Sequence, residues 1–200
     1  MIHGVRSVDP LKRGVGRLAP AFRSAGFCVT VPQYGFIPAF AVGILQRIDD
    51  SIASTIGSFL QPNDILLGHS NGAALTYLIA KHYRIRGAIL INAALDSEHI
   101  PDCDWVHVYY NSGDWITRLA SMIPFHVWGD MGAVGYTGTH RSTVINVDCG
   151  HPPEPDLPVL SGHNAIFQPG NTAAWARFMA GQTVRAIAAQ PRPPGDSPCQ

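Results

Sequence analysis

A serine bracketed by glycines stands near the middle of residues 65–74, which read ILLGHSNGAA. An apolar run leads into the Gly68-x-Ser70-x-Gly72 pattern, and a run rich in alanine and leucine leads out of it. This order predicts a strand, a sharp turn and a helix, and the two glycines leave room for that turn. The turn would lift the Ser70 hydroxyl above the sheet, where the Asn71 N–H could stabilise an oxyanion. Ser70 is therefore the candidate nucleophile.

The strand, turn and helix around Ser70 resemble the nucleophile elbow of the α/β-hydrolase superfamily, and the resemblance extends over residues 1–189. It implies a three-layer α/β fold, doubly wound around a mostly parallel sheet. His3-Gly4 takes the place of the family's His-Gly loop, so the chain looks like a minimal member that lacks the first antiparallel strands. The same resemblance implies that Val5, with Arg6 as the alternative, supplies the second oxyanion N–H beside that of Asn71.

The family order implies an acid after the serine and a histidine after the acid. Residues 105–110 form the second apolar run beyond the elbow strand, and Asp114 follows them closely, in the usual position of the acid. Asp96, which follows the preceding apolar run, is the alternative. A buried carboxylate in this place would hold the imidazole in the required tautomer and stabilise the imidazolium.

Two histidines follow the last apolar run, residues 143–147, and either could be the base. His163 has Gly162 before it and Phe167 shortly after it, which favours a loop that can turn and is then anchored. His151 is followed by two prolines, which keep the backbone extended and lead the chain away. We expect His163 to be the base, and His151 remains the alternative.

Apolar runs rich in β-branched residues alternate with helical patterns, which predicts a parallel sheet covered on both faces. The expected strands are Met1–His3, Phe27–Val31, Asp64–Leu67, Ala88–Asn92, Trp105–Tyr110 and Thr143–Val147. The expected helices are Leu11–Ala25, Gly43–Leu60, Asn71–Tyr83 and Thr172–Ala189. All of these elements belong to one expected domain, residues 1–189.

Residues 115–142 interrupt this rhythm, because they contain glycines and tryptophans but no clear strand. A long irregular segment within a compact domain is usually a functional loop or lid. Its apolar residues predict an acyl-binding wall if the segment folds over the site, or additional core if it does not. Residues 190–200 hold four prolines and few apolar residues, which favours a disordered tail.

Composition argues against several classes of protein. Lysine plus arginine and aspartate plus glutamate both number 14, so no charge surplus favours a nucleic-acid partner. No apolar stretch approaches the roughly 20 residues of a membrane span, and no signal peptide is visible. The four cysteines lack metal spacing, which favours free or buried thiols in the cytoplasm and leaves a disulfide open. No metal or cofactor motif is present, so we expect a cofactor-free enzyme of unspecified oligomeric state.

Together these residues predict a serine hydrolase that cleaves a small-molecule carboxylic ester through a Ser70-His163-Asp114 triad and an acyl-enzyme. The apolar lid segment favours a lipophilic acyl group. A thioesterase or an amidase could use the same triad, because the triad does not discriminate among these substrates. A non-catalytic binding protein, or an enzyme of other chemistry on the same scaffold, is the alternative from another class.

Overall fold

The computed structural model describes residues 14–31, 42–122, 128–139 and 143–190, with the side chains of the second range described from Asp49 onward. The expected strand Met1–His3, the proposed oxyanion donor Val5 and most of the tail, 191–200, lie outside these residues. No helix of the described ranges is both long enough and apolar enough to cross a membrane.

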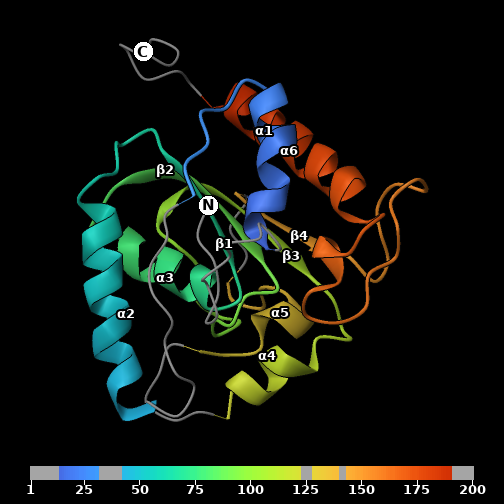
Figure 1. Cartoon of the computed structure of the whole chain (residues 1–200). Helices are drawn as coiled ribbons and strands as arrows, with labels where there is room; N and C mark the ends of the chain where they lie inside the picture. Colours follow the sequence, from blue (N-terminus) through green and yellow to red (C-terminus); the bar gives the residue numbers. More distant parts are fainter. Residues whose placement is uncertain (1–13, 32–41, 123–127, 140–142, 191–200) are drawn as a thin grey trace.

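In the described part of the chain, four parallel strands form the sheet, in the order in which they occur in the sequence (Figure 1). They are β1 (Ile65–His69), β2 (Ile85–Ile91), β3 (Cys103–Tyr110) and β4 (Val144–Asp148). His69 pairs with Ile91, and Ile91 pairs in turn with Tyr109. The carboxyl ends of the strands therefore meet at one edge of the sheet, where ligands bind in open α/β folds.

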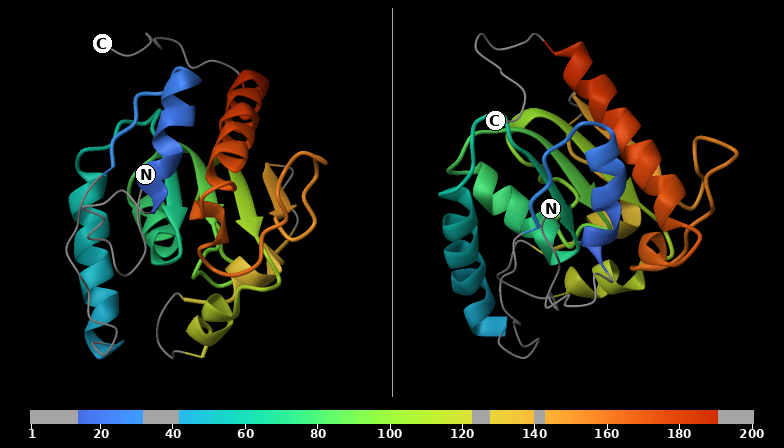
Figure 2. Two further views of the ribbon diagram at one scale, coloured as in Figure 1. Left: turned by 45° about the vertical axis from the view of Figure 1, so that its right-hand side comes forward. Right: turned by 45° about the horizontal axis from the view of Figure 1, so that its top comes forward.

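Helices cover the sheet on both faces, as the alternation of apolar runs predicts. They are η1 (Val15–Leu18), α1 (Ala19–Ser24), α2 (Val42–Gly57), α3 (Asn71–Ala80), α4 (Trp115–Ala120), α5 (Met131–Val134), η2 (Ala165–Phe167) and α6 (Thr172–Ala189). Helices α1 and α6 pack together on one face, and α2 and α3 pack together on the other (Figures 1 and 2). The three-layer α/β fold expected from the sequence is thereby confirmed.

Each face of the sheet has its own apolar core. On the α1 and α6 face, Trp175 and Met179 pack with Leu18 and Tyr109, and all four are fully buried. On the α2 and α3 face, side chains of α3 and the central strands form the second core. Its fully buried members include Leu75, Ile79, Ala88 and Leu90. These two cores make the central strands apolar on both faces, which explains their near-continuous hydrophobic sequences.

One predicted strand is wrong. Residues 27–31 are not part of the sheet, although their burial alternates between half-buried and exposed. The alternation arises because Phe27 and Val29 pack against the core on the α1 and α6 face. A period of two in burial predicts an extended chain, but a strand also needs a neighbour whose backbone it can pair with.

The segment 115–142 contains α4 and α5 in its described residues and no strand, in line with its sequence. Figure 2 shows both short helices near the carboxyl-terminal edge of the sheet. Among the described cysteines, Cys103 and Cys149 are outside any disulfide, as expected, whereas Cys28 is disulfide-bonded, a possibility that the sequence left open. The cytoplasmic location, expected because no signal peptide or membrane span is visible in the sequence, stays a prediction.

Candidate active site

Ser70 occupies a strained turn between β1 and α3. Its φ of 57° and ψ of −125° put it in a region that residues other than glycine rarely adopt. Its backbone N–H donates to Ile91, and its carbonyl accepts from the N–H groups of Ala73 and Ala94, at 3.0 and 3.1 Å. These bonds to the helix that follows and to the neighbouring strand stabilise the unusual turn.

Gly68 permits this turn because the strand and the helix approach each other closely at that point. A β-carbon at position 68 would lie 2.4 Å from the carbonyl oxygen of Gly72. Only glycine fits there without moving the backbone, so the first glycine of the pattern is a requirement of the elbow. The second glycine supplies the backbone that makes this approach.

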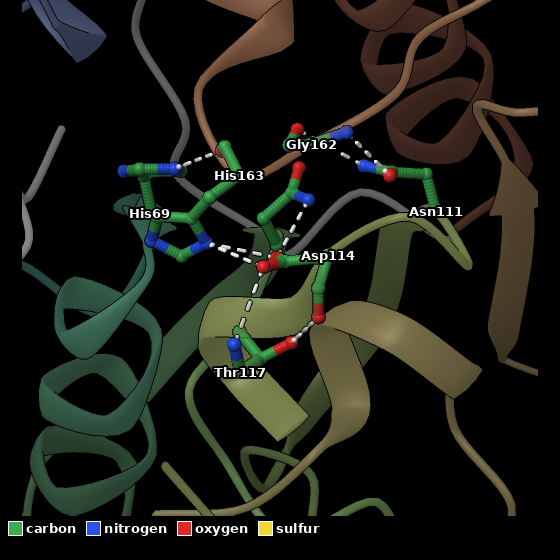
Figure 3. Close-up of polar contacts among 7 residues, drawn as sticks. His69, Asn111, Asp114, Thr117, Gly162 and His163 are labelled. Carbon is green, nitrogen blue, oxygen red and sulfur yellow. Dashed lines mark hydrogen bonds and ion pairs between the residues drawn. The ribbon is translucent and has the colours of Figure 1, made fainter. Parts of the chain in front are cut away.

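Asp114 and His163 form a buried pair at the same edge of the sheet (Figure 3). Nδ1 of His163 lies 2.8 Å from one carboxylate oxygen of Asp114 and 3.0 Å from the other. The side chain of Asp114 is fully buried, and that of His163 is 8% exposed. A carboxylate buried against Nδ1 fixes the tautomer that leaves Nε2 able to accept a proton.

Two further residues bind the Asp114 carboxylate. Asn92 donates to one oxygen through its side-chain amide at 2.8 Å, and Thr117 donates to the other through its backbone N–H at 3.2 Å. Burial by itself would raise the pKa of Asp114, but the hydrogen bonds and the charge of His163, together with these donors, lower it. Asp114 is thereby kept ionised beside the imidazole.

The backbone around His163 is bound to the end of β1 and to the loop after β3 (Figure 3). Nε2 of His69 lies 3.1 Å from the carbonyl oxygen of His163, and the two rings are 4.8 Å apart. On the other side, Gly162 donates its N–H to the side-chain oxygen of Asn111 at 3.0 Å. Since His69 directly precedes Ser70, this packing brings the His163 ring to the elbow.

The alternative residues lie elsewhere. His151 is 85% exposed and bonds Asp148 at 2.8 Å, three residues away. Asp96 accepts from the N–H of Glu98 at 2.9 Å, and its side chain is 49% exposed. The structure therefore brings neither His151 nor Asp96 to the buried carboxylate–imidazole pair.

Asn71, the proposed oxyanion donor, begins α3, so its N–H is one of the first four of that helix and has no intrahelical acceptor. Its buried side chain donates to Asp49 of α2 at 3.2 Å and accepts from the indole N–H of Trp128. The predicted lid segment is thus attached directly beside the elbow. Within the described residues, no group of three or more His, Cys, Asp or Glu could hold a metal ion.

Comparison with known proteins gives matches in structure alone. No protein-family model and no curated sequence matches the chain. A candidate hydrolase of the α/β superfamily from Xanthomonas campestris pv. campestris superimposes with a TM-score of 0.53 at 16% identity, covering 92% of this chain and 96% of that one. An esterase domain from a Rhodothermus marinus protein gives 0.54 at 12% identity, covering 92% and 85%. The chain has the α/β-hydrolase fold.

In an α/β-hydrolase fold the segments that follow several strands contribute to one site, and the sequence reasoning missed three residues in those segments. Asn92 follows β2, Asn111 follows β3, and Thr117 lies in the first turn of α4. The pattern that could have found the asparagines is a polar residue that ends an apolar strand, because such residues gather at the carboxyl-terminal edge. Thr117 offers a weaker pattern, an Asp-x-x-Thr helix start.

Proposed function

We propose that the protein is a serine hydrolase in which Ser70, His163 and Asp114 form the catalytic triad. The observation that carries the proposal is the buried Asp114–His163 pair, whose imidazole packs on the residue next to a strained serine turn. A strained turn and a buried carboxylate both cost stability, which favours a functional explanation for them. Nε2 of His163 is then expected to face the Ser70 hydroxyl.

In this mechanism the Ser70 oxygen attacks the ester carbonyl while its proton passes to Nε2 of His163. The oxyanion is stabilised by the Asn71 N–H and, by proposal, a second N–H from Val5. The bond to the alcohol breaks as His163 returns the proton to the leaving oxygen, which gives an acyl-enzyme. Water then attacks in the same way, with His163 taking its proton, and releases the acid and the free serine.

An apolar acyl group is favoured by helix α4, which follows Asp114 directly. Most of its apolar side chains, and one just beyond it, are on the surface rather than in the core. They are Trp115 at 62% exposed, Ile116 at 37%, Leu119 at 52% and Met122 at 76%. Such a surface beside the site would bind a lipophilic chain better than a sugar or a peptide.

The test combines labelling by a fluorophosphonate probe with hydrolysis of p-nitrophenyl esters. The wild-type protein should be labelled at Ser70, and Ser70→Ala should lose both labelling and turnover while its circular dichroism is unchanged. His163→Gln should lower the rate by several orders of magnitude. Wild-type turnover in folded Ser70→Ala would contradict the proposal.

His151 offers a matched control, because it makes the same imidazole–carboxylate contact at the surface. His151→Gln removes a histidine from an aspartate at the same 2.8 Å as His163→Gln does, but at an exposed site. We expect its kcat to stay within about twofold of the wild type. A large loss in His151→Gln with none in His163→Gln would reassign the base.

A further inference from the structure

The side chain of Asn111 makes two hydrogen bonds to the backbone of Gly162, in the loop that leads from β4 to His163 (the histidine loop). Its amide oxygen accepts from the N–H of Gly162 at 3.0 Å, and its amide nitrogen donates to the carbonyl of Gly162 at 3.4 Å. Asn111 is 1% exposed, and its own carbonyl accepts from the N–H of Asp114 at 3.0 Å. One side chain therefore connects the turn that carries the acid to the residue before His163.

His69 holds the same loop from the other direction. Its Nε2 must be the donor to the His163 carbonyl, because a carbonyl only accepts. Its ring also packs edge-on against Phe167 of η2, with centroids 4.8 Å apart. His69 is 7% exposed, so this contact is shielded from water.

We propose that Asn111 and His69 are positioning residues, which together hold the backbone of residues 162 and 163 so that the imidazole bridges Asp114 and Ser70. The proposal rests on the function proposed above. It assigns a role in the reaction to two residues that act through the backbone of the histidine loop rather than by transferring a proton.

The structure of the histidine loop explains why its backbone needs to be held in place. The Asp114 carboxylate holds only the ring of His163, so the ring moves whenever the backbone moves. Gly162 has a φ of +93°, and the loop that leads to it from Asp148 is long and rich in proline. A misplacement of about 1 Å in a catalytic group can lower a rate by about 100-fold. Bonds to its backbone from the end of β1 and from the loop after β3 prevent that displacement.

The experiment compares Asn111→Leu and His69→Phe with a matched control, Asn146→Leu. Asn146 on β4 makes the same pair of bonds to the backbone of one residue, Tyr136, both at 2.9 Å, but on an exposed part of the sheet. Asn111→Asp is included because it keeps the size and the acceptor of asparagine should Asn111→Leu fail to fold. Each variant is measured for kcat, KM and the pH profile of hydrolysis, and for the downfield NMR resonance of the His163 Nδ1 proton.

We expect kcat to fall about 10- to 100-fold in Asn111→Leu and His69→Phe, with KM within about twofold. The kcat of Asn111→Asp should lie between theirs and that of the wild type. The control, Asn146→Leu, should have the wild-type kcat. The Nδ1 proton resonance should broaden or disappear in the two main variants alone. A wild-type kcat in the folded variants, or an equal loss in Asn146→Leu, would overturn the proposal.

The NMR measurement separates this proposal from the proposed function. If the wild-type protein neither hydrolyses esters nor reacts with the fluorophosphonate, the proposed function fails. The resonance then decides the positioning role by itself, because the Asp114–His163 bond exists without turnover. Loss of the resonance in Asn111→Leu and His69→Phe but not in Asn146→Leu supports the positioning role. Persistence of the resonance in the two main variants overturns that role.

Discussion

At the scale of single residues, Asp114 combines three structural tasks. It accepts from the imidazole, from Asn92, and from the first turn of α4, whose N-cap it forms. A capping aspartate also faces the positive end of its helix, which favours the charged carboxylate. The acid of the proposed triad is therefore placed by the start of a helix.

We predict that Asp114→Asn lowers kcat by a factor on the order of 1,000 to 10,000. The asparagine amide would donate toward Nδ1 of His163 and impose the tautomer that cannot accept the serine proton. Steady-state hydrolysis of p-nitrophenyl butyrate measures the loss. Asp96→Asn is the control and should retain wild-type kcat, because the Asp96 carboxylate caps an exposed turn. The opposite ranking would move the acid to Asp96.

His107 is a second buried histidine, and it lies in the core rather than in the site. It is 1% exposed, between the rings of Trp105 and Tyr109 on β3, and its Nδ1 has no hydrogen-bond partner. Burial lowers the pKa of His107 from 6.5 to about 4, because the charged form would lose its hydration.

This lowered pKa predicts a specific dependence of stability on pH. Between pH 6.5 and about 4 the unfolded chain protonates this histidine and the folded chain does not. Stability therefore falls as the pH falls through that window, by ~3 kcal/mol, since one pKa unit is worth about 1.36 kcal/mol. Urea unfolding of wild type and His107→Leu at several pH values measures this difference.

The variant should lack that part of the pH dependence. The lowered pKa of Asp114 acts in a lower window, below its ordinary value of 3.8, so the two groups are separable. If His107→Leu and the wild type lose stability in parallel from pH 6.5 to 4, the assignment to His107 is wrong.

At the scale of elements, the segment between β3 and β4 is hydrogen-bonded at several points to the carboxyl-terminal edge of the sheet. Met131 and Gly132 donate their N–H groups to the carbonyls of Leu95 and Ala93, in the loop after β2. Trp128 donates to the Asn71 side chain at the elbow. These bonds fix the second part of the segment, while α4 presents apolar side chains to solvent.

We predict that the double variant Leu119→Ser, Met122→Ser lowers the preference for octanoate over acetate esters about 3- to 10-fold. Each buried methylene of an acyl chain contributes roughly 0.8 kcal/mol to binding. Removing part of the apolar surface of α4 therefore reduces the advantage in kcat/KM that a longer acyl chain has. The ratio of kcat/KM for the two esters is the measurement. Phe59→Ser is the control, since Phe59 is about as exposed as Met122 but follows α2 and precedes β1, at the opposite edge of the sheet. An unchanged ratio in the double variant would exclude α4 from acyl binding.

At the scale of the whole molecule, helix α6 joins the core to the histidine loop. Trp175 is fully buried, packs against Tyr109 and Phe178, and donates its indole N–H to the carbonyl of Pro158 at 2.9 Å. The loop from β4 to His163 is thus anchored by the same side chain that fills the core on the α1 and α6 face.

We predict that Trp175→Ala lowers the free energy of unfolding by ~3–5 kcal/mol, through the lost burial and the cavity left behind. Val184→Ala, at a position of the same helix that is 44% exposed, should change it by less than about 0.5 kcal/mol. Urea denaturation followed by circular dichroism measures both. A similar cost for the two variants would show that α6 does not depend on this core contact.

Local patterns in the sequence were sufficient for the four described strands and for the elbow. The strands β1 to β4 and the helix after Ser70 follow from runs of neighbouring residues, and burial on both faces of a parallel sheet makes those runs conspicuous. The same local information was misleading for residues 27–31, because whether an extended chain joins a sheet depends on a partner distant in the sequence.

What the sequence alone determined is which residues are available at the carboxyl-terminal edge: a serine in a forced turn, then aspartates, then histidines. The tertiary structure decided which of them meet. His163 and His151 lie on one connection after β4, and the packing of that connection, which includes its bonds to Asn111 and His69, leaves His163 beside Asp114. Such contacts span 94 and 51 positions of the chain. They depend on the registers of the strands and on burial, which no local pattern encodes.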